Sequence, residues 1–188
     1  LKLGITNPIP IERIRAFEVG RVFAPVVSDE LPIETLHVAG VVMRGEGGLW
    51  AAAAQPPLVF DAKGAVEHLF EALGLAATFT AGANEPFLHP GASAAITLGE
   101  RHVGVVGELH PETAARFEID APCAIFALDL DAIVATSPAP VKYSEVSRQP
   151  SVRRDLAVLL SRDGPARGGL DAIRGAAGPH LVAADAAG

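Results

Sequence analysis

The sequence is poor in residue types that mark particular classes of protein. It has 188 residues, one cysteine (Cys123) and an aromatic fraction of only 5%. A single cysteine excludes an internal disulfide framework and favours a reducing, cytoplasmic compartment. No apolar run reaches the roughly 18–20 residues that a membrane-spanning helix needs, so we expect no membrane contact. The N-terminus has neither an initiator Met nor a signal peptide, and we expect the chain to be part of a longer protein.

Motifs for metal and nucleotide binding are also missing. The six histidines and Cys123 form no H-E-x-x-H or C-x-x-C pattern. His89 and His110 each precede a proline, which is more typical of turns that bond nearby backbone than of metal ligands. Lys63-Gly64 lacks the upstream glycine and the following Ser or Thr of a phosphate-binding loop. The residues therefore predict no metal ligand and no cofactor-binding residue.

Two local patterns leave catalytic hypotheses open. Gly91-Ala92-Ser93-Ala94-Ala95 is similar to the G-x-S-x-G turn of serine hydrolases, which would use Ser93 with a histidine such as His110. The residues after Ser93 predict a strand rather than the required helix, which favours a small packed residue instead. Asp129 and Asp131 lie two apart on a predicted strand and should share one face. They could be a catalytic or cation-binding pair, or a solvated strand end.

Charge is distributed unevenly along the chain, whose net charge is −7. Residues 1–141 carry 8 Lys and Arg against 17 Asp and Glu, whereas residues 142–188 carry 7 against 5. The Thr-Ser-Pro-Ala-Pro stretch that ends at Pro140 has the composition of a linker. The pattern predicts two modules, 1–140 and 141–188, with different partners.

We expect the stretch from His89 to Pro111 to form a hairpin at the centre of the fold. Two β-rich runs, Ala92–Leu98 and His102–Leu109, are joined by Gly99-Glu100-Arg101, a short link typical of a β-hairpin. Glycines inside the second run indicate that another backbone or side chain packs closely there.

Hydrophobic periodicity predicts the other elements. Between Asp61 and Leu73, apolar residues recur at intervals of three and four, which predicts a helix. Asp61 could cap its start, and Gly74 could end it. The predicted helices are Asp61–Leu73, Pro111–Phe117 and Leu170–Ala177, with a loop over residues 44–57. The predicted strands are Ile14–Phe23, Glu34–Met43, Ala124–Leu130, Arg153–Leu160 and His180–Asp185.

Five segments, taken in order, resemble one family. The His-Pro-Gly-Ala-Ser-Ala strand from His89, followed by Val-Gly-Val-Val-Gly-Glu-Leu-His-Pro, is similar to the β subunit of bacterial phenylalanyl-tRNA synthetase. The other four segments are Phe17–Phe23, Phe60–Gly64, Ile125–Leu130 and Pro150–Leu160 with its Arg-Arg-Asp-Leu-Ala core. Together they cover nearly the whole chain.

This resemblance implies an α+β fold. Residues 1–140 would form a non-catalytic module with an antiparallel, class II aminoacyl-tRNA-synthetase-like sheet and flanking helices. Residues 141–188 would form the N-terminal half of a ferredoxin-like anticodon-binding domain, as a truncated β-α-β unit. The implied function is that of a structural and tRNA-binding part of phenylalanine–tRNA ligase. In the complete enzyme, of two α and two β subunits, the α subunit attaches phenylalanine to its tRNA with ATP and magnesium.

The resemblance also implies that this chain carries no catalytic residue. Phe17–Phe23 resembles the motif 2 strand of class II synthetases, and Phe126–Asp131 resembles motif 3. In the second segment Leu and Asp replace the expected glycines, and no arginine follows before Lys142. Two carboxylates would repel the triphosphate of a nucleotide, so no ATP or magnesium site is expected here.

The tRNA-binding candidates are Lys142, Arg148, Arg153 and Arg154, because the matching segment of the family opens the anticodon-binding domain. Two alternatives stay open. The arginines could simply flank a solvated strand, or the chain could be a pure RNA-binding or assembly module.

The sequence departs from the family pattern in two places. The family has a helical stretch between its Asn-Pro and Phe-Glu-x-Gly segments, whereas here only Ile9–Ala16 separates Pro8 from Phe17. The ferredoxin-like domain stops near its middle, and the family's upstream editing module, with its metal-binding residues, is not on this chain. We therefore expect an incomplete piece of the subunit.

Overall fold

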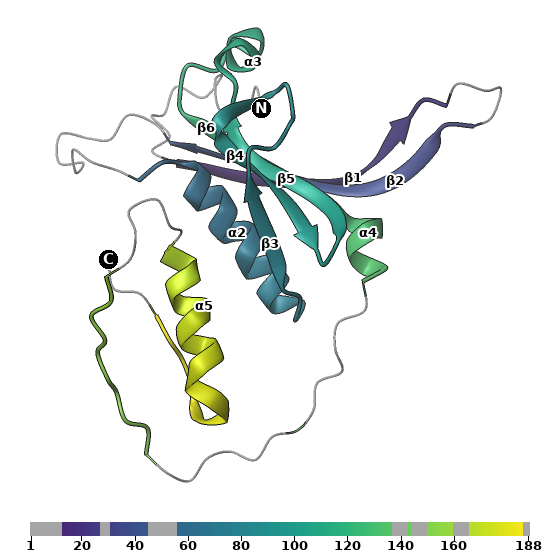
Figure 1. Ribbon diagram of the computed structural model, residues 1–188. Coiled ribbons are helices and arrows are strands. Elements are labelled where there is room, and N and C mark those ends of the chain that lie inside the picture. The colour runs from purple at the N-terminus through teal and green to yellow at the C-terminus, as the bar shows by residue number, and fades with distance from the viewer. Residues whose placement is uncertain are drawn as a thin grey trace. The chain divides into compact units, whose positions relative to one another are not determined.

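The computed structural model describes residues 13–26, 31–44, 56–136, 143, 150–159 and 166–185. The chain divides into two compact units, Leu1–Pro140 and Val141–Gly188, and the sheet lies in the first (Figure 1). Within the described residues, no helix is long and apolar enough to cross a membrane.

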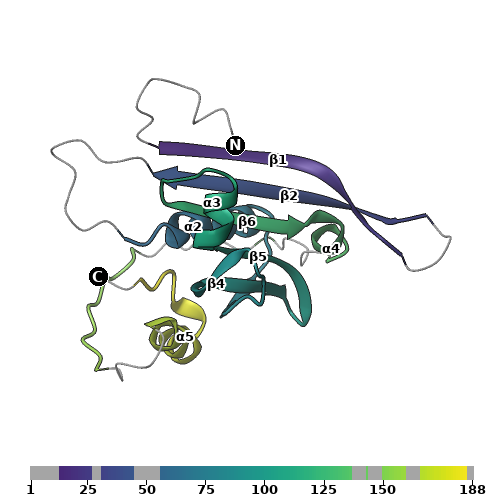
Figure 2. The same cartoon turned by 90° about the horizontal axis from the view of Figure 1, so that it is seen from above.

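The first unit is an antiparallel sheet of six strands with flanking helices, which confirms the predicted α+β architecture. Across the sheet the strand order is β1-β2-β6-β5-β4-β3 (Figures 1 and 2). The strands are β1 (Arg13–Ala24), β2 (Ile33–Arg44), β3 (Ala77–Ala81), β4 (Leu88–Leu98), β5 (Arg101–Leu109) and β6 (Cys123–Asp129).

The predicted hairpin of β4 and β5 is formed, β1 and β2 form a second antiparallel pair, and β6 lies between the two pairs. β1 pairs with β2 over their whole lengths, and β4 pairs with β5 across a turn in which Gly99 has a φ of +60°. β6 pairs with β2 on one side and with β5 on the other. The five-residue strand β3 extends the sheet beyond β4, and the sequence analysis missed it because the run is short.

Helix α2 (Val59–Ala72) begins two residues before its predicted start. The prediction that Asp61 caps it is wrong, since the N-cap is Leu58, without a side-chain hydrogen bond. The Asp61 carboxylate is instead paired with two arginines of the sheet. The predicted end is confirmed, because Gly74 has a φ of +67° and its N–H donates to the carbonyl of Glu71.

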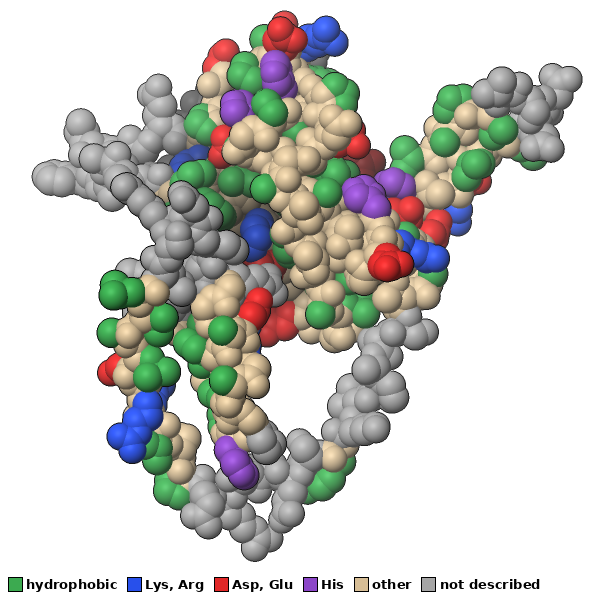
Figure 3. Space-filling model, in the orientation of Figure 1, with side chains coloured by type: hydrophobic (Ala, Val, Ile, Leu, Met, Phe, Trp, Pro, Cys, Tyr) green, Lys and Arg blue, Asp and Glu red, His purple; other side chains and the backbone are tan. Residues whose placement is uncertain are grey.

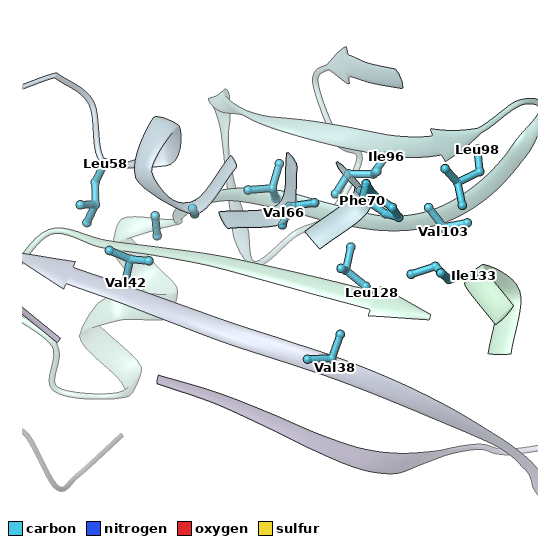
Figure 4. Close-up of a cluster of buried hydrophobic side chains, with 13 residues drawn as sticks. Val38, Val42, Leu58, Val66, Phe70, Ile96, Leu98, Val103, Leu128 and Ile133 are labelled. Carbon is cyan, nitrogen blue, oxygen red and sulfur yellow. The ribbon is translucent and has the colours of Figure 1, made fainter. Parts of the chain in front are cut away.

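The main core lies between α2 and one face of the sheet (Figure 4). Ala62, Val66 and Phe70 recur at four-residue spacing, so they form one stripe on α2, and each is at most 1% exposed. They pack with buried residues of the sheet and its connections. These are Val38, Val42, Leu58, Ile96, Leu98, Val103, Val106, Ala124, Leu128 and Ile133.

Two smaller apolar clusters lie outside this main core. One is formed by Met43, Ile119 and Cys123, close to helix α3 (Pro111–Arg116). The other is formed by Ala83, Leu88 and Val105. A third helix, α4 (Leu130–Val134), directly follows β6 and adds Ile133 to the main core.

The second unit contains helix α5 (Ala166–Ala177), which confirms the helix predicted there, and a 3-10 turn, η1 (Gly178–His180). The predicted strands are wrong where the structure describes them: residues 153–159 and 181–185 have no regular secondary structure. Strand-like apolar residues such as Val152 and Leu156 are exposed, at 74% and 70%. The described part of this unit contains no strand with which these segments could pair. Without such a partner, the backbone N–H and C=O groups of an extended segment bond to water, and no strand forms.

Glycine at position 104 is required by the close approach of β5 to β6. A Cβ built there would lie 2.2 Å from the carbonyl oxygen of Ala127, whereas one built at Gly64 of α2 would meet nothing within 4 Å. We therefore expect Gly104→Ala to destabilise the chain by about 2–4 kcal/mol. Gly64→Ala, in a helix interior, should stabilise it by up to about 1 kcal/mol. Urea unfolding of the two variants and the unchanged chain measures both effects, and equal midpoints for Gly104→Ala and the unchanged chain would contradict this account.

Candidate functional site

The two carboxylates at the end of β6 hold the backbone in place. Asp129 is the N-cap of α4, and its Oδ1 accepts the Ala132 N–H at 2.9 Å. Asp131 Oδ2 accepts the Leu36 N–H of β2 at 2.8 Å. The prediction that both lie on one strand is wrong, because β6 ends at Asp129 and Asp131 belongs to α4. Each carboxylate thus has a structural partner of its own.

Apolar packing occupies both faces of the motif 3-like strand. On the helix-covered face, Leu128 is fully buried and the Phe126 ring covers Gly40, where a Cβ would lie 2.3 Å from the ring. On the other face, Ile125 and Ala127 pack against the smaller clusters. The strand therefore presents packed hydrocarbon where a nucleotide site would need accessible glycines and a positive charge.

An ion-pair cluster that the sequence analysis missed joins the edge of the sheet to α2. Asp61 Oδ2 lies 3.1 Å from Arg13 Nη2 of β1 and 3.0 Å from Arg44 Nη2 of β2. Arg44 also donates from Nη1 to the Pro56 carbonyl, and its buried Nε has no partner within the described residues. Because these residues are far apart in sequence and paired through the tertiary fold, no local pattern could reveal them.

Ser93 is not placed as a nucleophile. It lies within β4, opposite Gly107, is 8% exposed, and its Oγ has no hydrogen-bond partner within the described residues. No hydrogen bond joins it to His110. The ring Nδ1 of His110 accepts the Glu112 N–H and so caps α3. The hypothesis of a hydrolase that uses Ser93 with His110 is therefore wrong, because Ser93 is buried without a hydrogen bond to a base and His110 Nδ1 is occupied in capping α3.

The two His-Pro pairs use the same local hydrogen bond. His89 Nδ1 accepts the Gly91 N–H at 3.1 Å, and His110 Nδ1 accepts the Glu112 N–H at 3.3 Å. The predicted hydrogen bonds to nearby backbone are confirmed, but the predicted placement in turns is wrong, because His89 lies within β4 and His110 is the N-cap of α3. Over the described part of the chain, no three His, Cys, Asp or Glu side chains gather closely enough to hold a metal ion. Burial raises the pKa of the Cys123 thiol to about 11, so it stays protonated at neutral pH.

The predicted tRNA-binding residues are only partly described. Arg153 and Arg154 are exposed on a segment without regular structure. Lys142 and Arg148 lie outside the described residues, as do residues 45–55 of the predicted loop. Exposed arginines are available to phosphates, but these two are not held in a defined geometry by any helix or strand.

A second surface is apolar and lies on β1, at the edge of the sheet. Phe17 is 76% exposed, Val19 51% and Phe23 60%. β2 pairs with β6 only from His37 to Met43, so the outer part of the β1–β2 hairpin extends past β6 (Figures 1 and 3). Exposed large apolar residues gathered on one strand are typical of a protein-binding surface.

Comparison with known proteins gives a consistent result. Residues 9–130 match the family model described as phenylalanyl tRNA synthetase beta chain CLM domain. The chain is 34% identical over 167 residues to a phenylalanine–tRNA ligase beta subunit of Carboxydothermus hydrogenoformans, covering 88% of this chain and 21% of that protein. It is 35% identical over 167 residues to the one of Lactiplantibacillus plantarum, covering 86% and 20%. The chain thus spans about a fifth of the length of these curated relatives.

Among solved structures, a pyrrolysyl tRNA synthetase of Desulfitobacterium hafniense superposes with a TM-score of 0.47 at 12% identity. The superposition covers 71% of this chain and 44% of that one.

The structural role of Asp131 can be measured. Asp131→Asn keeps the shape but weakens the charged acceptor for the Leu36 N–H, and we expect a loss of about 1 kcal/mol, small because the bond is exposed. Magnesium with ATP should change the melting temperature of neither protein. Thermal unfolding with and without 5–10 equivalents of ATP and magnesium tests both points. A melting temperature of the unchanged chain that rises with the nucleotide, and a variant that does not respond, would assign the carboxylate to a ligand site instead.

Proposed function

We infer the function from one premise: the chain belongs to the phenylalanyl-tRNA synthetase β chain family. We propose that it is the synthetase-like module of a phenylalanine–tRNA ligase β subunit, followed by the start of a tRNA-binding domain. Its role is structural. It supports the ATP-dependent attachment of phenylalanine to tRNA by an α subunit, in the cytoplasm.

This proposal rests on one observation: the residues of the motif 3-like strand and the two carboxylates after it stabilise the fold. Asp129 and Asp131 each accept a backbone N–H, and the residues before them are packed into the core. A sheet of this kind can keep its shape and its binding surfaces without holding a nucleotide. In this proposal the α subunit of the complete enzyme binds ATP and magnesium. The complete enzyme consists of two α and two β subunits.

The second unit supplies the proposed contact with tRNA. Residues 142–188 have more basic than acidic side chains, in contrast to the acidic first unit. Lys142, Arg148, Arg153 and Arg154 are the proposed phosphate contacts. Aromatic side chains that could stack on unpaired bases are sparse in this segment, where Tyr143 is the only one. We therefore assign it to backbone contact and not to sequence readout.

A chimeric enzyme tests the proposed function. The region of the Carboxydothermus hydrogenoformans β subunit that this chain matches would be replaced by this chain and expressed with the α subunit of that organism. We expect the two subunits to co-purify and to attach phenylalanine to tRNA, because the sheet that supports the complex is preserved. Aminoacylation and size-exclusion chromatography measure the two results.

The same chimera carrying Gly104→Ala is the matched control, since it should destabilise the module without changing an exposed side chain. Co-purification without aminoacylation would favour a pure assembly module. Failure of the subunits to co-purify, when the chimera itself is folded, would contradict the proposal.

The tRNA contacts are tested in the same chimera. Arg148→Ala, Arg153→Ala and Arg154→Ala should each weaken binding to any RNA to a similar extent, and each should make the slope of log affinity against log salt shallower by somewhat under about one unit. Arg116→Ala on α3, which removes an exposed charge from the first unit, is the control and should change neither quantity. Filter binding at several salt concentrations measures both. Equal behaviour of all four variants would leave the arginines as solvated side chains.

A further inference from the structure

Strand β1 is a long edge strand that lacks a lysine, a proline and a bulge, three features that commonly protect an edge. It pairs with β2 over its full length without a bulge, and no other described strand pairs with it. Eleven of its twelve residues are exposed. Edge strands are commonly blunted by lysine, proline or bulges, and β1 contains neither lysine nor proline. Its outer row of N–H and C=O groups is thus a template for another strand.

The side chains of β1 alternate in a regular way. Residues that are paired directly across an antiparallel ladder share a face, and Val19 is paired with Val38 of the main core. The odd-numbered residues of β1 therefore lie on the face that α2 covers. In order they are Arg13, Arg15, Phe17, Val19, Arg21 and Phe23. The even-numbered residues, which include Glu18 and Val22, lie on the other face.

This pattern is complementary to itself when reversed about Val19. If two β1 strands pair antiparallel about a twofold axis normal to the sheet, each residue faces one of its own parity. With Val19 opposite Val19, Phe17 faces Arg21 and Arg15 faces Phe23, which gives four arginine–phenylalanine pairs. On the other face Glu18 lies opposite Gly20, so no like charges meet.

The neighbouring registers are less favourable. An axis at Glu18 places the two Glu18 carboxylates opposite each other and Arg15 opposite Arg21, and like charges directly opposed are destabilising. An axis at Gly20 avoids this but pairs only residues 16–24, whereas the axis at Val19 pairs residues 14–24. The ion pair between Arg21 and Glu34 is exposed on both sides, so its rearrangement would be a small penalty.

We propose that β1 is a homodimerisation edge, at which two copies of this chain pair their β1 strands antiparallel about Val19 and join two six-stranded sheets into one. This interface goes beyond the proposed function, and neither the chimera's assembly with the α subunit nor its aminoacylation depends on it.

Charge at the axis tests the register. Val19→Lys places two ammonium groups opposite each other and should lower the association constant at least about tenfold. Val22→Lys is the matched control: its exposure, 46%, is close to the 51% of Val19, but its side chain would lie opposite Ala16. An equimolar mixture of Val19→Lys and Val19→Glu should restore the dimer. Sedimentation equilibrium over a range of concentrations compares the unchanged 188-residue chain, the two lysine variants and the mixture, with circular dichroism to show that each is folded.

A cross-link gives an independent readout. Directly opposed residues of an antiparallel pair have Cα atoms about 4.5–5.5 Å apart, within the range of a disulfide. Val19→Cys should therefore form a covalent dimer on mild oxidation. Val22→Cys should not, since its two copies would lie about 20 Å apart along the strands. The buried Cys123 should not compete. A monomeric unchanged chain, equal loss of the dimer in both lysine variants, or equal cross-linking of both cysteine variants would overturn the proposal.

Discussion

The fold depends on the close approach of β6 to its two neighbours. Each hairpin is local in sequence, but β6 must enter between them, with backbone pairing on both sides. Glycine makes this possible at two places. Gly40 of β2 leaves room for the Phe126 ring, and Gly104 of β5 leaves room for the Ala127 carbonyl. Side chains at these positions would separate the hairpins, and the surface on which α2 packs would be lost with them.

Sequence patterns predicted the elements that form from neighbouring residues. The other features of the fold depend on contacts between residues far apart in the sequence. Alternation and turn chemistry were sufficient for β1, β2, β4 and β5, and the four-residue stripe was sufficient for α2. The position of β6, and the pairing of Asp61 with arginines of two strands, involve residues far apart in sequence. The strand signal of residues 153–160 is as regular as that of β1, yet no strand forms over 153–159. A strand exists only where another strand completes its hydrogen bonds, and composition cannot supply that partner.

The same dependence explains why the candidate site was only partly predictable. In the sequence, Leu and Asp stand where motif 3 would have glycines. This difference was sufficient to predict that the strand binds no nucleotide. It could not show what the carboxylates do instead. Asp129 caps a helix, and Asp131 accepts the backbone N–H of Leu36 within β2. A carboxylate that accepts a backbone N–H has part of its hydrogen-bonding capacity occupied, and a cation would have to compete with that bond. The residues that stand where motif 3 would have glycines thus stabilise the fold through backbone hydrogen bonds and packing.

The two units present different chemistry to possible partners. On the first, the accessible feature is apolar: Phe17, Val19 and Phe23 lie on a strand whose outer edge pairs with no other described strand. Such a surface favours a partner that contributes a strand or a complementary apolar face. The affinity of such a contact depends little on salt concentration. On the second, the accessible feature is the charge of Arg153 and Arg154, which favours an anionic partner and weakens as counterions are added. Salt therefore weakens contact with an anionic partner and leaves apolar contact nearly unchanged, so that binding measurements at two ionic strengths distinguish the two kinds of contact.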